Sequence, residues 1–75
     1  MELPLNALAV GDSADIVRVE GDMSCRLVQL GFIPGTRVEC ELTAPMGDPS
    51  AYRVRGALIA LRRADAGQVR VRRDA

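Results

Sequence analysis

The amino-acid sequence predicts a mostly-β fold, a small barrel of short strands with one short inserted α-helix. Short runs rich in Val, Ile and Leu alternate with polar residues at the period of a β-strand, and Gly or Pro separates most of these runs. A single segment carries the spacing of a helix instead. A chain of 75 residues has few ways to cover the edges of a sheet, so closure into a barrel is the economical arrangement.

The chain begins with a turn and a strand. Leu5, Leu8 and Gly11 form a short opening turn, with the two leucines spaced to share one face. Residues 14–20 (ADIVRVE) are rich in β-branched side chains, which favour a strand.

A short helix is predicted over residues 23–30. Asp22 caps its start by accepting a hydrogen bond from a free N–H of the first turn. Gly31 stands at the left-handed position that ends many helices, and Phe32 folds back on the last turn. The apolar stripe of the helix has i, i+4 and i+7 spacing and consists of Met23, Leu27 and Leu30.

The second half of the chain contributes the other strands. Residues 37–43 alternate, so Val38, Cys40 and Leu42 face the core and Arg37, Glu39 and Glu41 face outward. A loop follows at residues 44–50, and two strands at 52–55 and 57–62 are separated at Gly56 by a bulge or a sharp turn. After a single turn at 64–67, the last strand at 68–73 points Val69 and Val71 inward and Arg70 and Arg72 outward.

Five strands with one helix predict a Src-homology-3-like (SH3-like) barrel whose helix lies between the first two long strands. Residues 1–75 form a single domain in this interpretation, since the chain is shorter than most domains. The N-terminus lacks the positive segment of a signal peptide, and the longest apolar run, Ala57–Leu61, is too short to cross a bilayer. We therefore expect a cytoplasmic protein that reaches a membrane only through another protein.

The composition argues against an enzyme. The sequence has no histidine and no lysine, so the commonest general base and the commonest amine nucleophile are missing. Cys40 lies on the apolar face of a strand, where an inert core cysteine is expected. Cys25 falls in the first turn of the helix, without an obvious base beside it.

No cofactor is predicted, although a divalent transition metal has weak candidate ligands. Two separated cysteines without histidine cannot form a closed zinc site. Glu39 and Glu41 share a strand face and could hold a hard cation weakly, and Cys25 is the one further candidate. A weak site for a divalent metal therefore stays open.

Arginine supplies every basic residue, and ten basic residues balance ten acidic ones. The outward positions of two strands would make a basic ridge if those strands lie close together: Arg53, Arg55, Arg70 and Arg72. A small nucleic-acid-binding barrel is the alternative that this ridge supports. The neutral charge and the two aromatic residues, Phe32 and Tyr52, argue against it, so no nucleic acid is expected.

Three segments together resemble the FeoA family, ferrous iron transport protein A. Residues 26–38 (RLVQLGFIPGTRV) are similar to its helix ending in Leu-Gly, followed by an apolar pair and Pro-Gly. Residues 44–49 (APMGDP) resemble its Ala-Pro-x-Gly-Asp-Pro loop, and 56–66 (GALIALRRADA) resemble its Leu-Arg strand and the turn after it. The resemblance runs from about Leu5 to Arg73.

The resemblance implies an SH3-like protein that assists or regulates the FeoB-type ferrous iron transporter through contact with its cytosolic GTP-binding part. Two surfaces are the candidates for this contact, the helix and its following turn (Arg26, Phe32, Ile33, Pro34) and the loop at 45–49 (Pro45, Met46, Asp48, Pro49). Many family members carry more basic residues at the start of the helix, where this chain has Ser24 and Cys25. A ferrous-iron carrier or sensor stays open as an alternative function. An exposed edge strand leaves a homo-oligomer open as well.

Overall fold

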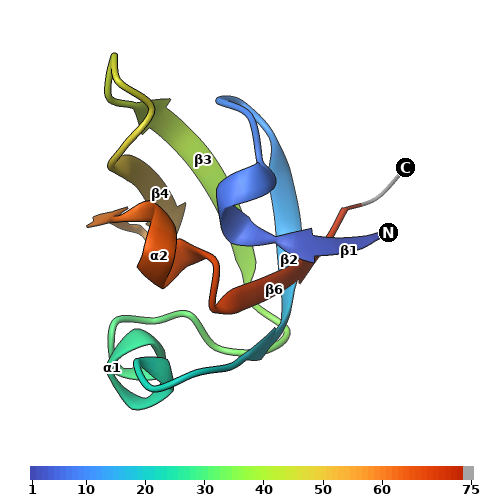
Figure 1. The fold of residues 1–75 in the computed structure, drawn as a ribbon. Coiled ribbons are helices and arrows are strands. Elements are labelled where there is room, and N and C mark those ends of the chain that lie inside the picture. Colours follow the sequence, from blue (N-terminus) through green and yellow to red (C-terminus); the bar gives the residue numbers. More distant parts are fainter. Residues whose placement is uncertain (74–75) are drawn as a thin grey trace.

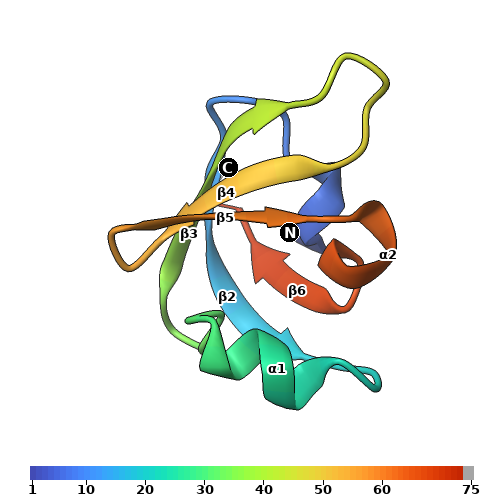
Figure 2. The ribbon, with the colours of Figure 1, turned by 90° about the vertical axis from the view of Figure 1, so that its left-hand side faces the viewer.

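In the computed structural model, which describes residues 1–73, a six-stranded antiparallel sheet has the strand order β1-β6-β2-β3-β4-β5. The strands are β1 (Glu2–Pro4), β2 (Ser13–Val19), β3 (Arg37–Thr43), β4 (Ser50–Val54), β5 (Ala57–Leu61) and β6 (Val69–Arg72). The helical segments are the 3-10 turn η1 (Leu5–Ala7), α1 (Ser24–Gln29) and α2 (Arg63–Ala66). The sheet curls around the core, with α1 between β2 and β3 in the chain (Figures 1 and 2).

This arrangement confirms the predicted SH3-like fold and adds one strand to it. β1 pairs with β6, through Glu2 opposite Arg72 and Pro4 opposite Arg70. Its three residues show no alternation and include a proline, which is tolerated on an edge strand, so the sequence carries no signal for it. Within residues 1–73 the sheet ends at β1 and β5, which do not pair, so the barrel is open between these two edges.

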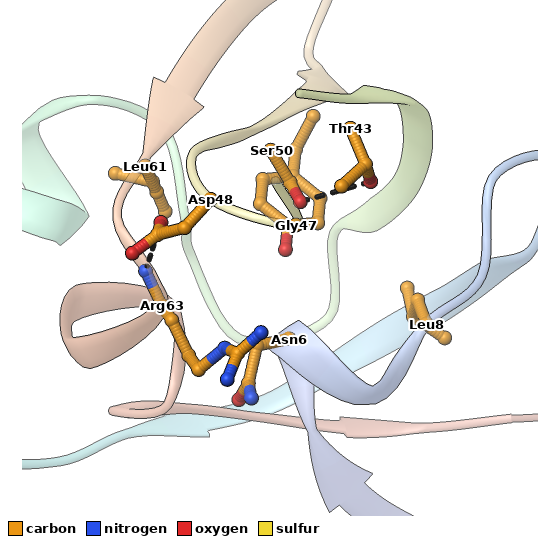
Figure 3. A pocket seen from close by; sticks show the side chains of 9 residues that line it. Asn6, Leu8, Thr43, Gly47, Asp48, Ser50, Leu61 and Arg63 are labelled. Carbon is orange, nitrogen blue, oxygen red and sulfur yellow. Dashed lines mark hydrogen bonds between the residues drawn. The ribbon is translucent and has the colours of Figure 1, made fainter. Parts of the chain in front are cut away.

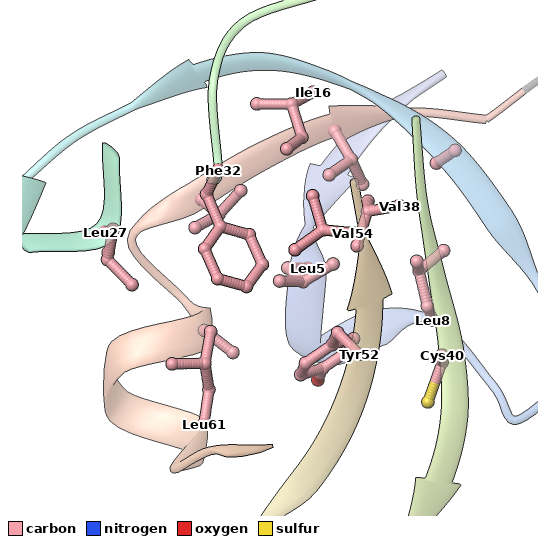
Figure 4. Packing of buried hydrophobic residues seen from close by; sticks show 14 residues of the cluster. Leu5, Leu8, Ile16, Leu27, Phe32, Val38, Cys40, Tyr52, Val54 and Leu61 are labelled. Carbon is pink, nitrogen blue, oxygen red and sulfur yellow. The ribbon is translucent and has the colours of Figure 1, made fainter. Parts of the chain in front are cut away.

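The core is one cluster enclosed by the curled sheet (Figure 4). Phe32 and Tyr52 are its largest fully buried side chains. Smaller apolar side chains from β2, β3, β4 and β6 lie around them. β5 contributes only its last residue, Leu61, to the buried cluster. The remaining buried members of the cluster are Leu5, Leu8, Ala14, Ile16, Leu27, Val38, Cys40, Val54, Ala66, Val69 and Val71.

The start of α1 differs from the prediction. Met23 is the N-cap residue, and no side chain of its own segment, Asp22 included, bonds to the first turn. Instead Gln68, distant in the sequence, accepts a hydrogen bond from the Met23 N–H through Oε1 at 3.0 Å. Its Nε2 donates to the Asp22 carboxylate at 3.2 Å. The capping role assigned to Asp22 is therefore wrong, because the Gln68 side chain accepts the hydrogen bond at the N-terminus of α1.

The end of α1 follows the prediction. Gly31 has a φ of +113°, in the left-handed region that glycine tolerates best. The Gly31 N–H donates to the Val28 carbonyl at 3.0 Å, and the Phe32 N–H donates to the Leu27 carbonyl at 3.0 Å. These two bonds form a Schellman motif, and the buried Phe32 and Leu27 side chains belong to the same core cluster.

Strand β3 contains an irregularity that the alternation did not show. Cys40 pairs with Tyr52, but Leu42 pairs with Ala51, so the register shifts between Cys40 and Leu42. Cys40 is buried, as predicted, whereas Leu42 is 53% exposed. The prediction that Leu42 faces the core is wrong, because an extra residue in a strand turns the side chains that follow it to the other face.

Candidate partner-binding surfaces

The first candidate surface consists of exposed residues on α1 and the turn after it. We call it the helix–turn surface: Arg26, Val28, Leu30, Ile33 and Pro34. Val28, Leu30 and Ile33 are 40%, 38% and 36% exposed, which is high for large apolar side chains. The structure thus places the predicted Arg26, Ile33 and Pro34 at the surface, and it adds Val28 and Leu30 to them.

Phe32 does not belong to this surface. Its side chain has no exposed area and lies in the core, where Figure 4 shows it beside Leu27. The hydrogen bond from its N–H to the Leu27 carbonyl folds the chain back over the helix end and turns the ring inward. The prediction of Phe32 as a contact residue is therefore wrong, because a partner cannot reach the ring without unfolding the barrel.

The second candidate surface is the β3–β4 loop, residues 44–49. Met46 is 93% exposed at its tip, and Pro45, Asp48 and Pro49 are exposed beside it. Hydrogen bonds fix the loop internally, from the Gly47 N–H to the Ala44 carbonyl at 2.7 Å and from the Ala44 N–H to the Pro49 carbonyl at 3.0 Å. An apolar tip on an ordered loop is suited to contact with another protein.

Asp48 ties this loop to the barrel. Its Oδ1 accepts a hydrogen bond from the backbone N–H of Arg63 at 2.9 Å, at the start of α2 (Figure 3). Thr43 and Ser50 are hydrogen bonded across the base of the loop at 3.0 Å. Asp48 therefore has a structural role, and Met46 is the loop residue with the most surface to offer a partner.

A polar pocket of about 250 Å³ lies beneath the loop. Asn6, Ser50 and the Arg63 side chain are among the residues that line it (Figure 3). Tyr52 lines it as well. Burial raises the pKa of the Tyr52 hydroxyl above its ordinary value, and the nearby Ser50 side chain offsets this in part. Tyr52 is therefore a neutral hydroxyl at physiological pH.

The two candidate surfaces lie at opposite ends of the molecule. Figure 2 shows α1 at the bottom of the barrel and the loop between β3 and β4 at the top, and Figure 1 shows the same separation. The molecule measures 28 × 28 × 22 Å along its principal axes. A partner that touches both surfaces must extend along a whole side of the barrel, so they are two separate candidate surfaces rather than one face.

The structure does not bring the weak metal-ligand candidates together. Cys25 is exposed on α1, whereas Glu39 and Glu41 are on β3. Glu41 forms an ion pair with Arg53 on the neighbouring strand. In the described part of the chain, no three His, Cys, Asp or Glu side chains gather into a group that could hold a metal ion.

The arginines of the supposed basic ridge are also dispersed. β2 and β3 lie between β4 and β6 in the sheet, which separates Arg53 from Arg70 and Arg72. Arg53 pairs with Glu41, and Arg70 lies 3.4 Å from a Glu2 carboxylate oxygen. The ridge that supported a nucleic-acid-binding barrel is therefore not formed.

A groove that the sequence did not predict separates α1 from the edge strand β5. Its volume is about 380 Å³, and we call it the edge groove. One wall is the apolar stripe of the helix with Arg26, and the other is the second half of β5 with Arg62 and Asp65 after it. The run at 57–61 indicated a strand, but only the sheet order shows that this strand is an edge. The lining residues of the stripe and strand are Met23, Leu27, Leu30, Ile59, Ala60 and Leu61.

The chain is thus a small SH3-like barrel with exposed apolar side chains on α1, on the turn after it and on the β3–β4 loop. Within residues 1–73, no helix has both the length and the apolar character needed to span a bilayer. The family model of the FeoA domain matches residues 3–73, and the chain belongs to the FeoA family.

Individual relatives agree with this assignment. A fusion protein of Fe(2+) transport protein A and the Fe(2+) transporter FeoB from Porphyromonas gingivalis is 39% identical over 69 residues, covering 89% of this chain and 8% of that protein. The FeoA protein of Chlorobium tepidum has a TM-score of 0.87 and 31% identity, over 97% of this chain and 71% of the other. Stenotrophomonas maltophilia FeoA, crystallised with zinc and described as an SH3 domain protein, has a TM-score of 0.85 and 29% identity, over 93% and 89% of the two chains.

Proposed function

We propose that this chain is a cytoplasmic accessory or regulatory protein of ferrous iron transport, which acts by binding a FeoB-type transporter. The observation that carries the proposal is the Porphyromonas gingivalis fusion, in which a segment related to this chain and a FeoB transporter are one polypeptide. Covalent linkage holds two partners at a high effective concentration, which is useful when they act in contact.

Features of this chain support a role in binding. The helix–turn surface and the β3–β4 loop present Ile33 and Met46 to solvent on a barrel with one buried apolar core. Exposed apolar side chains on a rigid scaffold are typical of protein contact sites. The sequence supplies no histidine or lysine for acid–base or amine chemistry, so we infer that the chain is not an enzyme.

The test uses a FeoB-type transporter reconstituted in lipid vesicles, with purified chain added outside on the cytosolic face. We expect saturable binding and a change in the rate of ferrous iron flux. Met46→Ala should weaken binding if the β3–β4 loop is in the contact, and Ile33→Ala should do so if the helix–turn surface is. Arg72→Glu, on β6 and away from both surfaces, serves as the control. Absence of binding and of any flux change in every guanine-nucleotide state would contradict the proposal.

A parallel titration separates this proposal from the iron-carrier alternative. Ferrous iron is added to the isolated chain under anaerobic conditions in a calorimeter. We expect no stoichiometric binding in the micromolar range. Tight binding that is lost when Cys25, Glu39 and Glu41 are replaced by alanine would favour a carrier or sensor instead.

A further inference from the structure

We propose that the edge groove binds an extended acidic and apolar segment of a partner protein, which adds to β5 as a further strand. The proposed binding does not depend on the partner being a transporter. Three observations carry it: unpaired backbone groups on β5, an apolar wall facing them, and unpaired arginines around the groove.

The backbone of β5 has free hydrogen-bonding groups on the side that faces away from β4. β4 and β5 are joined by a two-residue turn in which Arg55 and Gly56 have φ values of 52° and 82°. In such a hairpin the residues that flank the turn exchange hydrogen bonds, and pairs then alternate along the strands. The register Val54–Ala57 and Tyr52–Ile59 therefore leaves both backbone groups of Leu58 and Ala60 on the open edge.

The open edge faces the groove. In Figure 2 β4 lies above β5 and α1 lies below it, on the side of the free edge. The stripe of α1 forms the far wall, where Leu30 is 38% exposed although Leu27 beside it is buried. A strand placed on β5 would have its backbone bonded to Leu58 and Ala60 and its side chains against Leu30, which is the geometry of peptide recognition by strand addition.

The charge around the groove is positive although the chain as a whole is neutral. Arg26 and Arg62 line the groove on its two walls, with Asp65 as the acidic residue among them. Arg55 lies at the far end of β5, its Cδ 3.5 Å from the position that a Cβ on Gly31 would take. In residues 1–73 none of these three arginines has an ion-pair partner, and neither have Arg63 and Arg72. The arginines that form ion pairs are Arg18, Arg37, Arg53, Arg70 and Arg73. Carboxylates on an incoming segment would form ion pairs with the arginines around the groove.

The same charges disfavour a second copy of this chain as the occupant. An antiparallel pair of β5 strands centred on Ile59 would bring Arg55 of one copy beside Arg62 and Arg63 of the other. Like charges placed opposite each other across a strand pair are destabilising. The groove therefore fits an acidic segment from another protein better than it fits β5 of a second copy.

The test is an NMR titration of the isotope-labelled full chain with an end-blocked eight-residue peptide in which valine and glutamate alternate. We expect saturable binding and slower hydrogen exchange at the Leu58 and Ala60 amides, by about tenfold or more. The amide of Ile59, already bonded to β4, should change little. A peptide with lysine in place of glutamate should bind about tenfold more weakly.

Charge-reversal variants provide the matched control. The double variant Arg26→Glu/Arg62→Glu should reverse the preference between the two peptides, whereas Arg72→Glu, which changes the charge on β6, should leave it unaltered. Equal binding of the two peptides, or binding without protection of Leu58 and Ala60, would overturn the proposal. Protection that grows with the concentration of the chain alone would overturn it too, because the edge would then pair with a second copy.

Discussion

Phe32 and Ile33 are neighbours in the chain with opposite environments. Phe32 has no exposed surface, and Ile33 is 36% exposed on the helix–turn surface. The left-handed Gly31 before them makes this division, because it turns the chain back across the end of α1 and sends one side chain inward. Phe32 thus contributes to the stability of the core, and its neighbour Ile33 is a residue of a candidate contact surface.

The variants Phe32→Ala and Ile33→Ala should separate these two roles. Removal of a buried aromatic ring lowers the free energy of unfolding by about 3–5 kcal/mol, enough to unfold much of a chain this small. Ile33→Ala should change it by only about 0.5 kcal/mol, and it should weaken partner binding if the helix–turn surface is in the contact. Urea denaturation followed by circular dichroism measures the free energy of unfolding of both variants. Equal losses of stability would show that Ile33 is a core residue.

Tyr52 gives the molecule a dependence on high pH. Burial raises the pKa of its hydroxyl in the folded chain, whereas the unfolded chain titrates near the ordinary value of about 10. Above that pH the unfolded state loses its proton first, so stability should fall as the pH rises further. The measurement is the urea midpoint between pH 8 and 11. Tyr52→Phe, corrected for its own change in stability, should remove this part of the fall, and an unchanged pH profile would contradict the assignment.

At the scale of the elements, α1 depends on a side chain from the other end of the sequence. Gln68 binds both the Met23 N–H and the Asp22 carboxylate, and a Cβ on Gly21 would stand 2.5 Å from Gln68 Oε1. The helix has only six residues and would be marginal alone, so this tertiary bond helps to define where it begins.

Replacement of Gln68 should therefore cost more than replacement of Asp22. Gln68→Ala leaves a helix N–H without its cap and should lower the free energy of unfolding by about 1 kcal/mol. Asp22→Ala removes only an exposed hydrogen bond and should cost less. Chemical denaturation of both variants decides the order. The reverse order would mean that Asp22 caps α1 in solution, as local sequence patterns suggest.

The elements that local patterns determine were predictable from sequence. The alternation at 37–43 gave the bounds of β3, and Gly31 with its neighbours gave the end of α1. The failures have tertiary causes: β1 exists through its pairing with β6, and Leu42 is exposed because β3 shifts register against β4. A period-two pattern carries no information about either.

At the scale of the whole molecule, the strand order decides where function can lie. It places β5 on an edge, separates Arg53 from Arg70 and Arg72, and sets the helix–turn surface and the β3–β4 loop at opposite ends of the barrel. The exposure of Met46 and Ile33 could be anticipated from a loop and a turn in the sequence. The edge groove could not, because it joins segments whose proximity only the sheet order reveals.

Because the two candidate surfaces are separate, single variants can test the role of each surface in partner binding. Met46→Ala should leave the free energy of unfolding within about 0.5 kcal/mol of the parent, because its side chain is 93% exposed. It should weaken binding only if the β3–β4 loop is in the contact. Thermal unfolding together with transporter binding measures both effects. Unfolding of the variant would mean that the loop tip packs against the barrel in solution.

The most direct test of the central claim, that the chain acts by contact with a FeoB-type transporter, is an NMR titration of the isotope-labelled chain with the cytosolic GTP-binding part of that transporter. It is carried out with and without guanine nucleotide. We predict saturable shifts confined to one end of the barrel, either around Ile33 and the edge groove or around Met46. Absence of shifts in every nucleotide state, together with absence of binding to the full-length transporter, would contradict this interaction.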